Sequence, residues 1–150
     1  MERIASFTVN HDNIAEGIYV SRIDGDIITY DMRMRRPNMG DYIDNLTIHS
    51  LEHMFATYVR NSTIGDKIIY FGPMGCQTGF YLLVRNESNE KVLETVKNVL
   101  MNILNHKGEI FGNTREECGN YRNLNLEAAQ IEAKRYLDLL NSKEVTFKYE

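Results

Sequence analysis

Alternation of apolar and polar positions predicts several strands along this chain. A two-residue period is the pattern of a strand with one buried face. It occurs near Ile4 to Val9, and again in a hairpin that runs from Ile18 through the turn Asp24-Gly25 to about Arg35. Asp-Gly is a typical two-residue hairpin turn. The runs Lys67 to Phe71 and Phe80 to Arg85 flank a Gly/Pro-rich turn and are expected to be strands as well.

Apolar residues three and four positions apart predict three helices. The first runs from Thr47, its expected N-cap, to Asn61. The second covers Asn89 to Asn105, with Gly108 at its C-terminal end, and the third covers about Leu126 to Leu140. The stripes expected to face the core are Ile48, Leu51, Met54, Phe55, Tyr58 and Val59 in the first helix, Val92, Val96, Val99, Leu100 and Ile103 in the second, and Leu126, Ala129, Ala133, Leu137 and Leu140 in the third.

Strands joined by short turns and interrupted by helices predict an α+β fold. We expect a mainly antiparallel sheet of about four strands, covered by helices on one face. With 150 residues and 43% hydrophobic content, the chain is long enough for one core and cramped for two. Residues 1–150 are therefore expected to form a single domain.

The charge balance argues against a nucleic-acid or membrane partner. Lys and Arg number 17 against 21 Asp and Glu, which gives a net charge of −4. No apolar run approaches the roughly 20 residues that span a bilayer. The opening residues, Met-Glu-Arg-Ile-Ala-Ser-Phe, contain no apolar signal region, so we expect a soluble protein in the reducing cytoplasm.

The strongest chemical signal is His49-Ser-Leu-Glu52-His53, an H-x-x-E-H motif within the first predicted helix. Helix positions i and i+4 share a face, so His49 and His53 can both reach one cation. Glu52 lies beside that face, where it can act as a base without being a ligand. The ordinary alternative is a pair of solvated or hydrogen-bonded histidines.

Two histidines alone do not hold a catalytic metal, so a third ligand must come from elsewhere in the chain. Cys118 lies in the polar segment 113–120, which could bend back toward the helix. Cys76 lies in the turn 72–79, whose glycines and proline expose it to a cleft. A disulfide between the two cysteines is the alternative, and a reducing compartment argues against it.

Alternation in the second hairpin strand places Arg33 on the face opposite Tyr30 and Met32. Arg33 is therefore not expected on the core side of the sheet. Ser6 lies in the first predicted strand, and His11 follows its end. Taken singly, Ser6, His11 and Arg33 are typical of surface residues rather than of a functional site.

Taken together, the motifs resemble the S-ribosylhomocysteine lyase (LuxS) family over nearly the whole chain. The resemblance rests on their joint order: Ser6-Phe with His11, Asp31-Met-Arg33 with Pro37-Asn38, Thr47-Ile-His-Ser-Leu-Glu-His53, Gly72-Pro-Met-Gly-Cys-Gln-Thr-Gly-Phe80 and Glu117-Cys118-Gly119. Many family members have Asp and Ser where this chain has Tyr70 and Gly72. That departure leaves the histidines, Glu52 and both cysteines unaffected.

The resemblance implies conversion of S-ribosylhomocysteine to homocysteine and 4,5-dihydroxy-2,3-pentanedione, the precursor of the quorum-sensing signal autoinducer-2. The reaction proceeds by carbonyl migration through enediolates and β-elimination. It also implies one divalent metal per subunit, natively ferrous iron, with zinc or cobalt as possible substitutes. The implied roles are metal ligation by His49, His53 and Cys118, acid/base catalysis by Glu52 and Cys76, and substrate contact by Ser6, His11 and Arg33 in a homodimer with shared active sites.

Two other functions compete with this interpretation. In an H-x-x-E-H metallopeptidase, Glu52 would activate water and an acidic residue such as Glu127 would be the third ligand, which leaves both cysteines without roles. In a non-enzymatic metal-binding module, four protein ligands would close the site.

Overall fold

Four antiparallel strands form one sheet in the order β1-β2-β4-β3 in the computed structural model, which describes residues 1–149. The strands are β1 (Gly17–Asp24), β2 (Ile27–Arg33), β3 (Ile68–Pro73) and β4 (Gly79–Arg85). Gly25, in the turn between β1 and β2, has a φ of 61°, a conformation that glycine adopts without strain. The predicted hairpin and the two later strands are confirmed.

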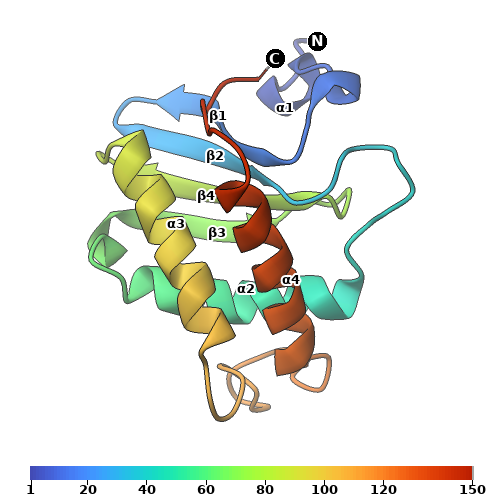
Figure 1. Cartoon of the computed structure of the whole chain (residues 1–150), viewed down its shortest axis with the longest axis vertical. Coiled ribbons are helices and arrows are strands. Elements are labelled where there is room, and N and C mark those ends of the chain that lie inside the picture. Colours follow the sequence, from blue (N-terminus) through green and yellow to red (C-terminus); the bar gives the residue numbers. More distant parts are fainter. Residues whose placement is uncertain (150) are drawn as a thin grey trace.

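Three long helices cover one face of this sheet (Figure 1). They are α2 (Asn45–Arg60), α3 (Asn89–Leu104) and α4 (Leu126–Asn141). Their apolar stripes pack against Tyr30 and Phe80, which are fully buried on the inner face of β2 and β4. The predicted α+β fold and the helical stripes are confirmed, except that Tyr58 and Leu126 are only partly buried. In the described residues, no helix is both long and apolar enough to cross a membrane.

The predicted first strand is wrong. Residues 4–9 contain a short helix, α1 (Ala5–Thr8), and a 3-10 turn, η1 (His11–Asn13), follows it. Local bonds replace pairing with a neighbouring strand: the Phe7 amide donates to the Ile4 carbonyl, and the Thr8 hydroxyl donates to the Ala5 carbonyl. Ile4 and Phe7 are exposed, so the alternation of residues 4–9 reflects no buried face of a sheet.

Helix α2 begins one turn earlier than the sequence pattern indicated. The N-cap is Asp44 rather than Thr47, because the Asp44 carboxylate accepts a hydrogen bond from the Thr47 amide at 2.8 Å. His49 and His53 therefore lie in the second and third turns of the helix. Helix α3 ends at its C-cap Asn105, three residues before Gly108, and η2 (Gly65–Lys67) leads from α2 into β3.

Replacing Asp44 by alanine is expected to reduce the free energy of unfolding by about 1 kcal/mol, the usual cost of losing an N-cap. Asp44→Asn keeps a side-chain acceptor and is the matched control. Chemical denaturation at pH 7 measures both variants. Equal stability of Asp44→Ala and the wild-type protein would show that another group caps α2.

The same contact has a pH signature. Hydrogen bonds from Thr47 lower the pKa of Asp44 below its ordinary value. A carboxylate with a lowered pKa in the folded state stabilises the fold above the pKa of the unfolded chain, and this stabilisation is lost as the pH falls through the folded pKa. The stability difference between the wild-type protein and Asp44→Asn should therefore shrink as the pH falls below about 4.

Candidate active site

Helix α2 presents His49 and His53 on one face, and their rings meet edge to face with centroids 4.6 Å apart. Each ring is oriented by a backbone carbonyl from another part of the chain. His49 Nδ1 lies 2.8 Å from the Asn123 carbonyl oxygen, and His53 Nδ1 lies 2.8 Å from the Phe111 carbonyl oxygen. A carbonyl oxygen only accepts, so the two shorter contacts place the proton on Nδ1 of each ring; the Asn123 side-chain nitrogen, 3.2 Å from His49 Nδ1, is the more distant neighbour. Each Nε2 therefore has a free lone pair, as a metal-binding histidine requires.

Cys118 brings the third donor atom to the two histidines. Its Sγ lies 3.3 Å from His49 Nε2 and accepts a hydrogen bond from the Asn120 amide at 3.4 Å. The candidate donor atoms of His49, His53 and Cys118 all lie within 4.8 Å of one another. Two imidazoles and a thiolate are a suitable donor set for zinc or a similar divalent ion, and three protein ligands leave a position open. The residues fit a catalytic metal.

Gly112 allows the loop before Cys118 to approach the face of α2 that carries His49 and His53. Its φ is 69°, and a Cβ atom there would lie 2.9 Å from His53 Nδ1. Only glycine meets both conditions without strain. This close approach places the Phe111 carbonyl where it accepts from His53.

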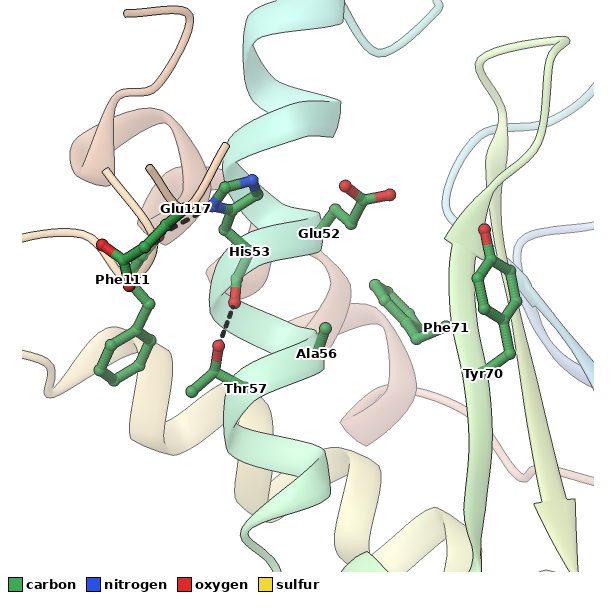
Figure 2. Close-up of a pocket in the computed structure, with 9 residues that line it drawn as sticks. Glu52, His53, Ala56, Thr57, Tyr70, Phe71, Phe111 and Glu117 are labelled. Carbon is green, nitrogen blue, oxygen red and sulfur yellow. Dashed lines mark hydrogen bonds between the residues drawn. The ribbon is translucent and has the colours of Figure 1, made fainter. Parts of the chain in front are cut away.

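Glu52 points into a cleft of about 720 Å³ between α2 and β3, next to His53 (Figure 2). Phe71 of β3 and Phe111 of the opposite loop supply apolar walls. The carboxylate therefore stands beside the face of α2 that carries His53.

Tyr70 also lines this cleft, and its phenol ring lies across Gly72. A Cβ atom at position 72 would collide with that ring, so the two departures from the family pattern belong together. The ring occupies the space that a serine side chain at position 72 would need.

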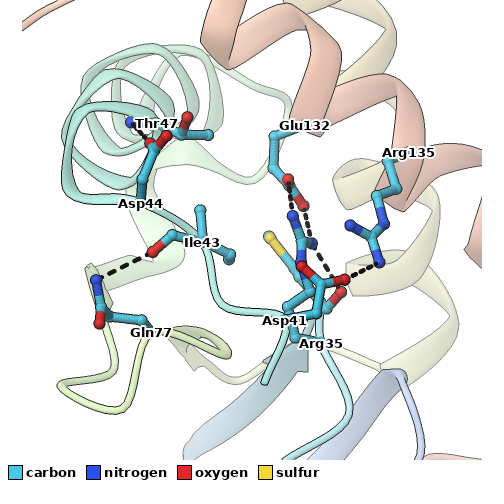
Figure 3. Close-up of polar contacts among 9 residues, drawn as sticks. Arg35, Asp41, Ile43, Asp44, Thr47, Gln77, Glu132 and Arg135 are labelled. Carbon is cyan, nitrogen blue, oxygen red and sulfur yellow. Dashed lines mark hydrogen bonds and ion pairs between the residues drawn. The ribbon is translucent and has the colours of Figure 1, made fainter. Parts of the chain in front are cut away.

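Cys76 lies on the exposed turn between β3 and β4, outside the cleft that Glu52 lines. Both cysteines are free thiols. The residues after Cys76 are bound to the chain that follows β2. The Ile43 amide donates to the Gln77 carbonyl at 2.9 Å, and the Gln77 side chain donates back to the Ile43 carbonyl at 3.1 Å (Figure 3).

A buried ion pair connects the chain after β2 to α4. Arg35 and Glu132 form two hydrogen bonds, at 2.7 and 2.6 Å, and both side chains are less than a tenth exposed (Figure 3). Burial alone would lower the pKa of Arg35, but its hydrogen bonds and charge interactions with Glu132 and Asp41 raise it above its ordinary value. Asp41 also accepts from Arg135 of α4 at 3.1 Å. These contacts hold together segments almost a hundred residues apart.

Arg33 lies on the predicted face of β2, but the expectation that its side chain is at the surface is wrong. Arg33 is 2% exposed, because Asp31 pairs with it at 2.7 Å and the C-terminal segment (residues 142–149) lies over the same face. Burial alone would lower the pKa of Arg33, whereas Asp31, with smaller effects of Cys76 and Tyr149, raises it. Arg33 is therefore a buried, paired cation close to Cys76.

Ser6 lies in α1, which Figure 1 shows near β1, and His11 begins η1. The Ser6 hydroxyl is hydrogen-bonded to Tyr81, and His11 Nδ1 donates to the Val9 carbonyl at 2.9 Å. Both residues are half-buried, and neither lines the cleft beside Glu52.

Sequence reasoning missed several residues that support the site. Asp31 could have been found, because it shares a strand face with Arg33 two positions away. Glu132 gave only the weaker signal of a charge on the inner side of a helix. The backbone carbonyls of Phe111 and Asn123 could not be predicted as partners, because every residue has a carbonyl and only the path of the loops decides which ones face the histidines.

Comparison with known proteins adds a family assignment. The family described as S-Ribosylhomocysteinase (LuxS) matches residues 4–146. The S-ribosylhomocysteine lyase of Borreliella afzelii is 42% identical over 156 aligned residues, which cover 99% of both chains. Proteins of the same name from Finegoldia magna and Clostridium acetobutylicum are each 40% identical over 95% of this chain and 94% of their own.

Proposed function

This chain belongs to the S-ribosylhomocysteinase (LuxS) family, and we propose that it acts at one divalent metal held by His49, His53 and Cys118. The family assignment and the similarity over nearly the full length make it an S-ribosylhomocysteine lyase. The products are homocysteine and 4,5-dihydroxy-2,3-pentanedione, the autoinducer-2 precursor. Ferrous iron is the proposed native ion, with zinc or cobalt as substitutes.

The observation that carries this proposal is the three-ligand cluster with a carboxylate beside it. Cys118 completes a donor set that the histidines alone could not, and Glu52 enters the adjacent cleft. A metallopeptidase would instead need an acidic third ligand such as Glu127, which does not join the cluster found among residues 1–149. A purely structural metal site would need a fourth protein ligand.

When bound, a divalent cation supplies Lewis-acid polarisation of the carbonyl and hydroxyl oxygens of the sugar. The proposed roles of the protein residues concern protons. Each isomerisation removes a proton from a carbon next to the carbonyl and returns one to the former carbonyl carbon. Cys76 takes and returns these protons as a thiolate, supported by the neighbouring Arg33 cation. Its exposure on the turn leaves the sulfur accessible to a substrate.

Glu52 is the proposed partner in proton transfer. From the cleft it exchanges a proton with the substrate oxygens during isomerisation. In the final elimination, a proton leaves the carbon next to the carbonyl, and the electron pair of the carbon–sulfur bond departs with sulfur. Protonation of that sulfur gives the free thiol of homocysteine.

A homodimer with shared active sites is the proposed assembly. Ser6, His11 and Arg33 are the proposed substrate contacts, with Ser6 and His11 contributed across the subunit interface. Neither residue lines the cleft of its own chain beside Glu52, and the exposed Ile4 and Phe7 flank Ser6. Exposed apolar side chains of this kind suit burial against a second subunit. Each 150-residue chain would act as one domain, and its free thiols suit the cytoplasm.

Subunit exchange tests this assembly. His11→Ala and Cys76→Ala homodimers should each be inactive, whereas mixing them should restore activity. One site of each heterodimer would then draw both residues from unmutated chains. Mass spectrometry of intact dimers verifies exchange. Verified heterodimers with no more activity than their parents would place His11 and Cys76 of one chain in the same site.

The function itself is tested by incubating the metal-loaded protein with S-ribosylhomocysteine and measuring free thiol. Release of homocysteine is expected, and cleavage of a peptide substrate is not. Peptide hydrolysis without thiol release would favour the metallopeptidase.

A further inference from the structure

The Cys76 sulfur is held by a side chain that has no place in the mechanism described above. Cys76 Sγ lies 2.9 Å from the hydroxyl oxygen of Thr78, two residues further along the turn. Thr78 is 1% exposed, so its hydroxyl is held in place within the fold. The contact therefore restricts where the sulfur can lie.

The direction of this hydrogen bond follows from the other partner of Thr78. Arg33 donates to the Thr78 hydroxyl oxygen at 2.8 Å, and an arginine has no acceptor. The Thr78 hydroxyl proton is consequently free to point toward Cys76. When Cys76 is a thiolate it has no proton to donate, so Thr78 is the donor in this contact, and the adjacent cation strengthens the bond. Such a donor stabilises negative charge on the sulfur when it acts as a base.

The Arg33 side chain is itself held in place by Asp31. Its Nε and Nη2 atoms donate to the two oxygens of Asp31, at 3.1 and 2.7 Å, in a bidentate pair that is 1–2% exposed. This pairing holds the plane of the guanidinium and aims Nη1 at Thr78. The position of the Thr78 hydroxyl thus depends on the Asp31 carboxylate.

Tyr149 of the C-terminal segment is the next residue in this set of connected hydrogen bonds. Its hydroxyl donates to Asp31 Oδ2 at 2.7 Å and is also hydrogen-bonded to Ser21 of β1. Its ring stacks on Tyr19, with centroids 4.8 Å apart. The backbone is tied down as well, because the Val20 amide donates to the Phe147 carbonyl at 2.8 Å. The C-terminal segment therefore lies against β1 and reaches the Asp31–Arg33 pair.

We propose that Thr78 and Tyr149 are positioning residues for Cys76, linked through Arg33 and Asp31. The C-terminal segment thereby becomes part of the active-site structure. This inference rests on the proposed role of Cys76 in the lyase reaction. Arg33 then contributes chiefly to kcat through Thr78, in addition to any contact with substrate.

The first test uses substitutions at Thr78. Thr78→Val keeps the shape but removes the hydroxyl, and it should lower kcat about 10- to 100-fold with little change in KM. Thr78→Ser restores a hydroxyl and should recover most of the rate. Thr63→Val, at an exposed position of the turn after α2, is the matched control. Thermal unfolding identifies any variant whose fold has changed.

A second readout does not depend on the lyase reaction. Alkylation of Cys76 by iodoacetamide at pH 7, followed by peptide mass spectrometry, should slow several-fold in Thr78→Val and recover in Thr78→Ser. Tyr149→Phe, which keeps the ring but loses the donor to Asp31, should lower kcat and the alkylation rate about 3- to 10-fold.

The outcomes separate this inference from the proposed function. If the wild-type protein releases no thiol from S-ribosylhomocysteine, the lyase proposal fails, and the alkylation rates still report on the contact. Unchanged alkylation and kcat in Thr78→Val would overturn the role of Thr78. A rise in KM at constant kcat in Tyr149→Phe would overturn the positioning role of the C-terminal segment and favour a direct contact with substrate.

Discussion

Cys118→Ala is expected to lose most of its metal, while Cys76→Ala retains it. Cys118 Sγ lies beside His49 Nε2, within the three-residue cluster, whereas Cys76 lies on a different loop and contacts Thr78. Removal of an outer-shell partner typically costs about 10- to 100-fold in metal affinity. Loss of a direct thiolate ligand should cost at least as much. Metal analysis after gel filtration measures the difference.

Cobalt substitution gives an independent readout of the same prediction. A cysteine thiolate bound to cobalt produces an ultraviolet charge-transfer band. The wild-type protein and Cys76→Ala should show the band, and Cys118→Ala should not. If the band disappears with Cys76 and persists without Cys118, the roles of the two cysteines are reversed.

Glu52→Gln and Cys76→Ala should keep their fold and metal but lose most turnover. General acid/base groups typically contribute about 10²- to 10⁴-fold each. Glutamine fills the same space as Glu52 without accepting a proton, so the loss should fall on kcat rather than on metal content. Steady-state thiol release with S-ribosylhomocysteine measures the rates.

Glu94→Gln, on the exposed side of α3, is a control for a charge change of the same kind. It should leave the rate unchanged. If both Glu52→Gln and Cys76→Ala turn over at near wild-type rates, neither residue moves the essential protons and the proposed mechanism is wrong.

Periodicity predicted the parts of the fold whose pattern depends on a buried face. The β1–β2 hairpin and helices α3 and α4 lie close to their predicted bounds, because their apolar stripes pack on one core. The predicted strand in the N-terminal segment (residues 4–9) was wrong because it has no such buried face. The exposed Ile4 and Phe7 bury nothing within this chain, so local hydrogen bonds determine the structure of this segment.

The part of the candidate site that lies on one helix could be predicted from the sequence. His49, Glu52 and His53 follow from the helical repeat alone. The choice of Cys118 as the third donor depended on the path of the loop that passes Gly112, which no local pattern determines. The burial of Arg33 depended on Tyr149, more than a hundred residues further along the chain. Contacts at such separations arise only from the complete fold.

Titration of the metal-free protein with a divalent ion tests the central claim most directly. Aliquots of ferrous or cobalt ion are added anaerobically, and thiol release from S-ribosylhomocysteine is measured after each addition. We predict that activity rises linearly and reaches its plateau at one ion per chain. Full activity in the metal-free protein, or no thiol release at any metal content, would contradict the assignment of a metal-dependent lyase site to His49, His53 and Cys118.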